Sequence, residues 1–80
     1  MNNDQIFDIM KVAASNVGIT LNQDDYNELV SDYIADSLMF VGFIVELENS
    51  FNIRIPDEYL LDETIKFSDL VGIINELEGC

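Results

Sequence analysis

Ser37 is the residue whose type and position could do the most specific chemistry in this sequence. It follows Asp36 and precedes a segment rich in apolar residues. A serine at a helix start most often caps the helix, accepting a hydrogen bond from a backbone N–H, but Asp36 can fill that role instead. A phosphodiester built on the Ser37 hydroxyl would lie at the positive end of the helix dipole, which favours an anion by roughly 0.3–1 kcal/mol. Ser37 is therefore either a cap or the attachment point of a phosphate-linked group.

The sequence excludes most catalytic arrangements. It contains no histidine, which removes the Ser-His-Asp and Cys-His systems that activate a nucleophile, and most zinc and iron sites. The spacing of its sixteen carboxylates fixes no acid and base pair in a dry cleft. Residues 24–28 lack the alternating ligands and central glycine of a calcium-binding loop, and the four glycines form no phosphate-binding motif. We therefore expect a chain that is not an enzyme and has no metal site.

The charge of the chain is strongly one-sided. Three basic residues stand against sixteen acidic ones, for a net charge of −13. Nucleic acids and anionic membranes are bound by clustered Lys and Arg, so neither is an expected partner. The expected partner is a protein with a basic patch, attracted by steering that salt weakens. The alternative is that the charge only keeps a small domain in solution.

Length and cysteine use indicate one small domain. Eighty residues can form one core but not two, so we expect a single domain over residues 1–80, and a monomer. Cys80 is the only cysteine and the last residue, so no internal disulfide is possible, and we interpret it as a frayed terminal thiol. Residues 1–5 lack the basic start of a secretory signal, and no apolar stretch approaches membrane-spanning length. We expect a cytoplasmic protein without stable membrane insertion.

Apolar spacing predicts an all-α bundle of three main helices and one short helix. Residues 4–17 have helical periodicity and stop at Gly18, whereas residues 18–35 are polar and predict a long loop with at most one helical turn, at residues 26–30. A second main helix begins at Asp36 and Ser37 and runs to about Phe51.

The remaining elements follow from a proline and a serine. Pro56 ends the preceding segment and can start a short helix, anchored by the apolar residues Tyr59, Leu60 and Leu61. Ser68 can cap the last helix, which stops at Gly79. Residues 52–55 alternate between polar and apolar, but four residues without a partner strand make no sheet.

The helix that begins at Ser37 carries two separate apolar stripes. At about 100° per residue, one stripe is wide enough to face the core of a small bundle, and the other lies on the far side of the serine. The second stripe is either covered by the loop of residues 18–35 or left open for a partner, and helix geometry does not decide between them. The core stripe comprises Phe40, Phe43, Ile44, Leu47 and Phe51; the second, called here the outer stripe, comprises Leu38, Val41 and Val45.

Together these residues resemble the acyl and peptidyl carrier proteins. Asp36-Ser37-Leu38 matches the triplet that opens the second helix in that family, and Leu47-Glu48, Phe51 and Ile55-Pro56 follow at the family's spacing. The order of helix, long loop, helix, short helix and helix extends the likeness over nearly the whole chain. The triplet alone is weakly specific, whereas the joint pattern is strongly specific.

The resemblance implies a function for the serine. Ser37 would receive 4′-phosphopantetheine from coenzyme A through a magnesium-dependent phosphopantetheinyl transferase, and the thiol of that arm would carry an acyl or aminoacyl thioester. It also implies that Asp36, Glu48 and the outer stripe meet basic, partly apolar patches on the transferase and on loading, condensing and modifying enzymes.

Some positions depart from the carriers of fatty-acid synthesis. Those proteins usually have further acids where this chain has Met39, Gly42 and Asn49, and often a glycine where it has Ile34. Fatty-acid, polyketide and nonribosomal-peptide pathways therefore all remain open. A function of another class is also open, namely an unmodified acidic module whose outer stripe inserts into a partner's groove.

Overall fold

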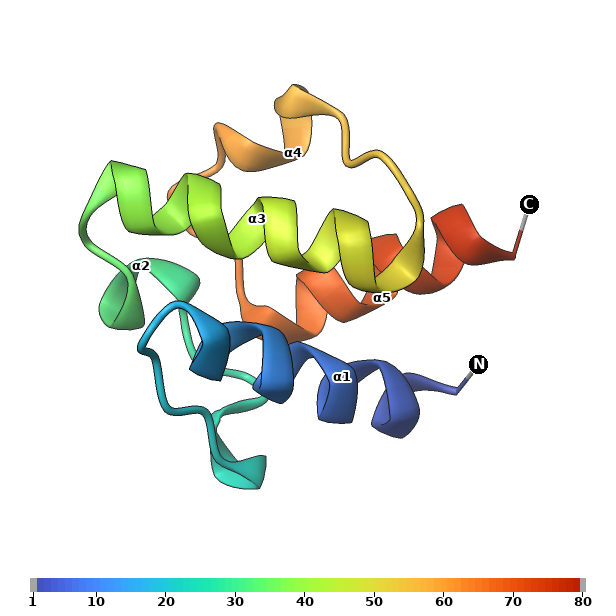
Figure 1. The fold of residues 1–80 in the computed structure, drawn as a ribbon, viewed down its shortest axis with the longest axis horizontal. Helices are drawn as coiled ribbons and strands as arrows, with labels where there is room; N and C mark the ends of the chain where they lie inside the picture. Colours follow the sequence, from blue (N-terminus) through green and yellow to red (C-terminus); the bar gives the residue numbers. More distant parts are fainter. Residues whose placement is uncertain (1, 80) are drawn as a thin grey trace.

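Three long helices carry the core of the protein, and two single-turn helices lie beside them (Figure 1). The computed structural model describes residues 2–79, so the expectation for Cys80 lies outside the described residues. The helices are α1 (Asn3–Asn16), α2 (Val30–Tyr33), α3 (Ser37–Phe51), α4 (Asp57–Leu60) and α5 (Phe67–Glu78), with a 3₁₀ turn at Gln23–Asp25. The predicted all-α class is confirmed, and α2 adds a short helix inside the predicted loop. Within residues 2–79, no helix combines the length and apolar character needed to cross a membrane.

The ends of α1 and α3 are set by side chains and backbone that the sequence indicates. Asn2 and Gln5 form a reciprocal capping box at the start of α1, with N···O distances of 2.8 and 3.0 Å. The predicted stop at Gly18 is confirmed, because this residue has a φ of +85°, where glycine avoids a clash. The helix α3 ends at Phe51 because Asn52 adopts the left-handed conformation, with a φ of 54°, before Pro56 is reached.

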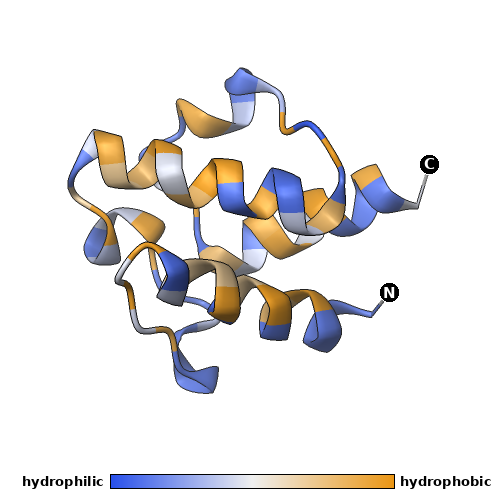
Figure 2. Ribbon diagram, in the orientation of Figure 1, coloured by the Kyte–Doolittle hydropathy of each residue, from blue (hydrophilic) through white to orange (hydrophobic). Residues whose placement is uncertain are grey.

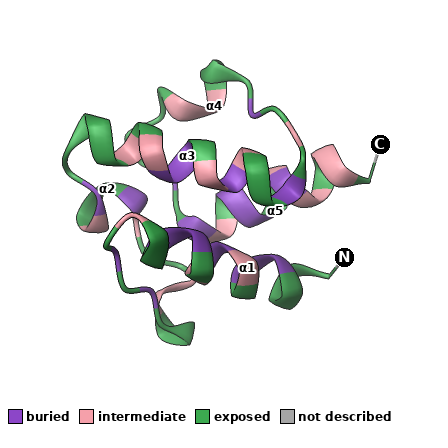
Figure 3. Ribbon diagram, viewed as in Figure 1, coloured by how far each residue is buried: buried purple, intermediate pink, exposed green. Residues whose placement is uncertain are grey.

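The core stripe of α3 faces the core, as predicted, and meets α1 and the start of α5 there. Phe43, Ile44, Leu47 and Phe51 are buried, and Phe40 is half-buried. Apolar positions of the three long helices turn toward one another, and the buried positions gather there (Figures 2 and 3). Phe67, at the start of α5, meets the ring of Phe43 edge-on at 6.3 Å and that of Tyr33 at 5.4 Å. These aromatic contacts tie α2 and α3 to α5.

Residues 18–35 are held in place by backbone hydrogen bonds with the first residues of α5 and the segment just before it. Val30 N–H donates to the Ile65 carbonyl oxygen at 2.9 Å, and Ser68 N–H donates to that of Tyr26 at 2.8 Å. The predicted helical turn at residues 26–30 is wrong, because these backbone groups pair across to the other segment instead. Buried apolar residues also anchor the loop, namely Ile19, Leu21, Val30 and Ile34.

Two predicted roles near α4 and α5 are wrong. Ser68 does not cap α5: the helix starts after Lys66, whose N–H donates to the Asp69 carboxylate at 2.9 Å. Leu61 does not anchor α4, because it follows the helix at the point where the chain turns, and it is 81% exposed. Ile65, a few residues further on, is buried in the core instead.

A hydrogen bond between Tyr33 and Asp25 fastens α2 to the 3₁₀ turn. Tyr33 Oη donates to Asp25 Oδ1 at 2.6 Å, and Asn22 N–H donates to Asp25 Oδ2 at 2.8 Å. These donors lower the pKa of Asp25 from its ordinary value of 3.8, and the same carboxylate raises the pKa of Tyr33 to about 12.

We expect Asp25→Asn to lower the free energy of unfolding at neutral pH, by an amount that shrinks in acid. The lowered folded pKa means that the Asp25 carboxylate stabilises the fold above its unfolded pKa near 3.8, and that this contribution is lost as the pH falls through the lowered value. The protonated Tyr33 hydroxyl contributes fully below its unfolded pKa of 10.0, and this contribution is lost as the pH rises through the folded pKa of about 12. Urea unfolding across pH measures the difference. Tyr33→Phe is the control background, in which Asp25→Asn should have a smaller effect, because only the Asn22 N–H still donates to the carboxylate. An equal deficit at every pH would contradict this account.

Candidate functional site

Ser37 is the first residue of α3, and its hydroxyl is free. Its side chain is exposed, and within residues 2–79 no hydrogen bond engages that hydroxyl. The cap is Asp36, whose Oδ1 accepts the N–H of Leu38 at 2.8 Å and of Met39 at 3.4 Å. The interpretation of Ser37 as a cap is therefore wrong, and Asp36 fills that role. A serine next to a dedicated cap keeps its nucleophilic oxygen available.

The N-terminus of α3 already has an anion. The Asp36 carboxylate accepts two of the first amide groups of the helix, so much of the favourable dipole interaction goes to Asp36 itself. The fit to a phosphodiester thus rests chiefly on the exposed Ser37 hydroxyl, with the Ser37 N–H beside it. Across residues 2–79, no three His, Cys, Asp or Glu side chains converge as metal ligands.

The outer stripe of α3 is open to solvent. Leu38 is 85% exposed, Val41 is 56% exposed and Val45 is 45% exposed, so the loop of residues 18–35 does not cover them. Exposed, half-buried and buried positions alternate along α3 (Figure 3). An apolar strip that begins beside Ser37 and remains in water in the isolated chain suits contact with another protein.

Glu48 has a structural contact that the sequence did not reveal. Its Oε2 accepts the N–H of Ile55 at 2.9 Å, which holds the segment before α4 against the end of α3. Glu48 lies about 16 Å along the helix from Ser37, as the rise per residue of an α-helix requires. The structure therefore brings Asp36, Ser37 and Leu38 together, with Glu48 at the far end of α3.

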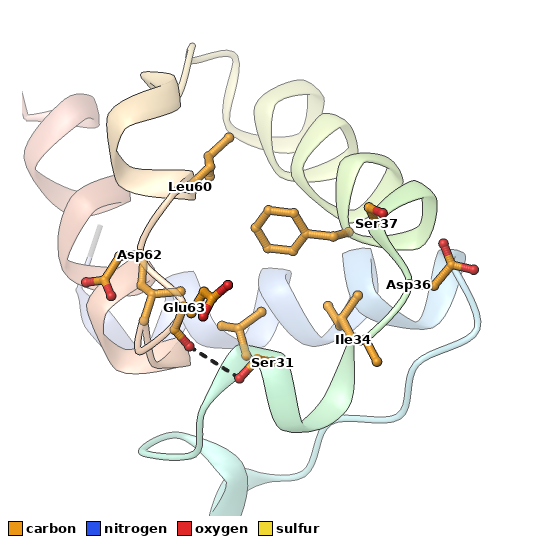
Figure 4. Close-up of a pocket in the computed structure, with 11 residues that line it drawn as sticks. Ser31, Ile34, Asp36, Ser37, Leu60, Asp62 and Glu63 are labelled. Carbon is orange, nitrogen blue, oxygen red and sulfur yellow. Dashed lines mark hydrogen bonds between the residues drawn. The ribbon is translucent and has the colours of Figure 1, made fainter.

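A cavity of about 270 Å³ opens beside Ser37. Figure 4 shows Ile34 and Leu60 on opposite sides of it, with Ser37 at the edge formed by α3. Ser31 Oγ donates to the Glu63 carbonyl oxygen at 3.3 Å and links α2 to the segment after α4 (Figure 4). The apolar lining residues are Val30, Ile34, Ala35, Phe40, Leu60 and Ile65; the polar ones are Ser31, Asp36, Ser37, Asp62 and Glu63.

Sequence reasoning missed this cavity because its walls come from separate segments. The core stripe gave the one sequence signal for an apolar wall near Ser37, because its first member, Phe40, stands one helical turn after Ser37. The cavity gives the site an apolar hollow next to a free hydroxyl, on the side of Ser37 away from the outer stripe.

We expect Asp36→Ala to lower the stability of the protein, because it removes the cap of α3. Loss of such a cap costs about 1 kcal/mol, which corresponds to a fall of roughly 4–8 °C in Tm for a domain of this size. Asp36→Asn is the matched control, because asparagine caps about as well but has no charge. Thermal unfolding followed by circular dichroism measures both. A wild-type Tm for Asp36→Ala would show that another group caps the helix.

Comparison with known proteins agrees with this geometry. The family described as "Phosphopantetheine attachment site" matches residues 8–74. An acyl carrier protein homolog of Ureaplasma parvum is 36% identical over 88% of this chain and 84% of its own length. The acyl carrier protein of Chloroherpeton thalassium is 39% identical over 89% of this chain and 81% of its own length. The acyl carrier protein of Chlorobium phaeovibrioides is 41% identical over 69% of this chain and 68% of its own length. No solved structure matches the chain significantly. The chain therefore belongs to the acyl carrier protein family, has an acyl carrier role and bears 4′-phosphopantetheine as a covalent cofactor.

Proposed function

We propose that this protein holds acyl or aminoacyl intermediates as thioesters on a 4′-phosphopantetheine arm attached to Ser37. The observation that carries the proposal is the free, exposed hydroxyl at the first position of α3, next to an aspartate that already caps the helix. A transferase can reach this oxygen without breaking a hydrogen bond of the fold. The arm comes from coenzyme A, with magnesium serving the transferase and not this chain.

The outer stripe and its acidic surroundings are the proposed contact with partner enzymes. Leu38, Val41 and Val45 offer apolar area that a partner can bury, starting at the attachment residue. Asp36 and Glu48 flank the stripe and face basic side chains of the partner, although one oxygen of each is used within the fold. The net charge of −13 steers such partners toward the carrier. In this role the chain is a cytoplasmic monomer, and catalysis belongs to its partners.

The pathway is proposed as fatty-acid, polyketide or nonribosomal-peptide-type biosynthesis. Met39 and Asn49 are exposed where fatty-acid carriers usually have acids, so the recognition face is less acidic than in those proteins. This difference supports a dedicated partner set in a specialised pathway as an alternative to general fatty-acid synthesis.

The experiment is an intact-mass measurement. Purified protein is incubated with coenzyme A, magnesium and a broad-specificity phosphopantetheinyl transferase. We expect the mass to rise by one phosphopantetheinyl group. An unchanged mass, under conditions where a known carrier is fully modified, would overturn the proposal.

The alternative of an unmodified interaction module, which would insert the exposed outer stripe into a partner's groove, does not agree with the membership of the chain in a family that bears 4′-phosphopantetheine. The two functions differ in their dependence on the serine. Only the module would keep its cellular function when Ser37 is replaced by alanine, whereas both would lose it when Val41 is replaced by aspartate.

A further inference from the structure

Gly42 lies in the middle of α3, and the fold does not require a glycine there. Glycine inside a helix lowers stability relative to alanine, because it loses more conformational freedom on folding. Beyond its chain neighbours and the backbone of α3, a Cβ atom on Gly42 would meet only Val17 Cγ1 within 4 Å, at 3.5 Å, which is an ordinary van der Waals contact. The glycine with a positive φ in residues 2–79 is Gly18. Neither crowding nor backbone geometry therefore explains the glycine at position 42.

The missing side chain of Gly42 leaves a notch in the surface of α3. On a helix, the positions three and four residues away are the neighbours on the surface. Val17, directly after α1, borders the notch from a second segment. Three of the four bordering positions on α3 are exposed apolar residues and the fourth is an acid, namely Leu38, Met39, Val45 and Glu46. The notch therefore lies between the outer stripe and the end of α1.

A second helix glycine, Gly72 in α5, differs from Gly42 in its surroundings. Gly72 is exposed, and an added Cβ atom would meet nothing within 4 Å. Its surface neighbours on the helix are all polar, namely Ser68, Asp69, Asn75 and Glu76. Of these two glycines, Gly42 alone has apolar surroundings that a partner protein can bury. The notch is thus defined by the glycine and its apolar border together.

The charges around the notch indicate what accompanies an apolar group in it. The helix α3 contains no basic residue, and its Glu46 borders the notch. Asn16 Nδ2 donates to Glu46 Oε2 at 3.3 Å, and Glu46 Oε1 has no hydrogen-bond partner among residues 2–79. A basic side chain of a partner can therefore pair with Glu46 at the edge of the notch, whereas an acidic one would be repelled.

We propose that the notch receives a bulky apolar side chain of the phosphopantetheinyl transferase, next to a basic side chain of the same enzyme that pairs with Glu46. The inference rests on the proposed attachment of the arm at Ser37. An enzyme that acts on the Ser37 oxygen must cover the start of α3, and Gly42 lies only about 7.5 Å further along the helix axis. At position 42, recognition depends on free space.

The test measures kcat/KM of the transferase from the organism that produces this protein, together with the Tm of each carrier variant. Gly42→Ala should raise Tm by roughly 4–8 °C, because alanine favours the helix. The same variant should lower kcat/KM roughly fivefold or more, because its methyl group takes up space in a packed contact. A Tm below that of the wild type would show that the fold needs this glycine, and would overturn the inference.

Gly42→Glu separates free space from charge. An added acid strengthens the attraction of a basic partner, so charge alone would make this variant a better substrate. If the notch is occupied, the longer side chain obstructs the contact, and we expect kcat/KM to fall at least as far as in Gly42→Ala. Glu46→Gln should lower kcat/KM at low salt and less so at high salt, because salt already weakens the ion pair of the wild type.

Gly72→Ala is the matched control, since it makes the same change inside another helix. It should raise Tm by a similar amount and leave kcat/KM unchanged. Equal losses of kcat/KM in Gly42→Ala and Gly72→Ala would mean that stiffer helices cause the effect, and would overturn the inference.

The remaining outcomes separate this inference from the proposed function. If a broad-specificity transferase does not modify the wild type, the proposed function has failed. If the wild type is modified but the Gly42 variants keep its kcat/KM, or Gly42→Glu is the better substrate, no side chain of the transferase occupies the notch.

Discussion

Ser37→Ala should abolish attachment of phosphopantetheine while leaving the fold unchanged. The substitution removes the oxygen that would form the phosphodiester. The neighbouring residues of the helix start, Asp36 and Leu38, have no hydroxyl that could replace it. Ser37 is exposed, and no described residue hydrogen-bonds to its hydroxyl, so the free energy of unfolding should change by no more than about 0.5 kcal/mol. Intact mass after incubation with coenzyme A and a transferase measures the first effect, and thermal unfolding measures the second.

Ser31→Ala is the matched control for this prediction. Ser31 is also exposed and lines the same cavity, but its hydroxyl donates to the Glu63 carbonyl oxygen and does not lie at the start of α3. We expect this variant to accept one arm, as the wild type does. If the arm is still attached in Ser37→Ala but not in Ser31→Ala, the attachment residue is Ser31, and the prediction is wrong.

Val41→Asp should weaken the use of the carrier by partner enzymes without unfolding it. A charged side chain at the centre of the outer stripe would have to lose its water on contact with a partner, which is costly. We expect kcat/KM of the transferase for this carrier to fall roughly tenfold to a hundredfold, as for a residue that contributes strongly to an interface. Because Val41 is 56% exposed, stability should change little.

Val12→Asp provides the comparison for Val41→Asp. Val12 is 60% exposed and lies on α1, outside the outer stripe, so the same substitution adds the same charge at a different place. It should leave kcat/KM nearly unchanged. An equal loss in both variants would mean that added negative charge, and not the outer stripe, determines the effect. A large fall in Tm for Val41→Asp would instead show that this position supports the fold.

The sequence predicted α3 and its surroundings well because local signals act there together. Asp36 is a strong cap, the core stripe has a clear helical period, and the chain turns at Asn52 before Pro56. The free Ser37 hydroxyl follows from these local features. Two points were undecided. One was whether Ser37 or Asp36 caps the helix, and the other was whether the outer stripe is exposed, which depends on where the loop of residues 18–35 lies.

The features that the sequence did not predict depend on contacts between distant segments. Residues 26–30 would be free to form a turn by themselves, but their backbone groups pair with the segment around Ile65 and Ser68. Glu48 carries no signal that its carboxylate accepts the Ile55 N–H. The cavity likewise exists only where α2, α3, the end of α4 and the segment after it converge, so residues such as Leu60 gave no sign of their place in it.

The most direct test of the central claim is a mass measurement on the protein from cells that produce it naturally. Trypsin can cut after Lys11 and Arg54, which yields a peptide of residues 12–54 that contains Ser37. We predict that this peptide bears one phosphopantetheinyl group, that fragmentation places it on Ser37, and that any thioester cargo adds its own mass to the arm. An entirely unmodified peptide, in cells whose other carriers are modified, would contradict the account.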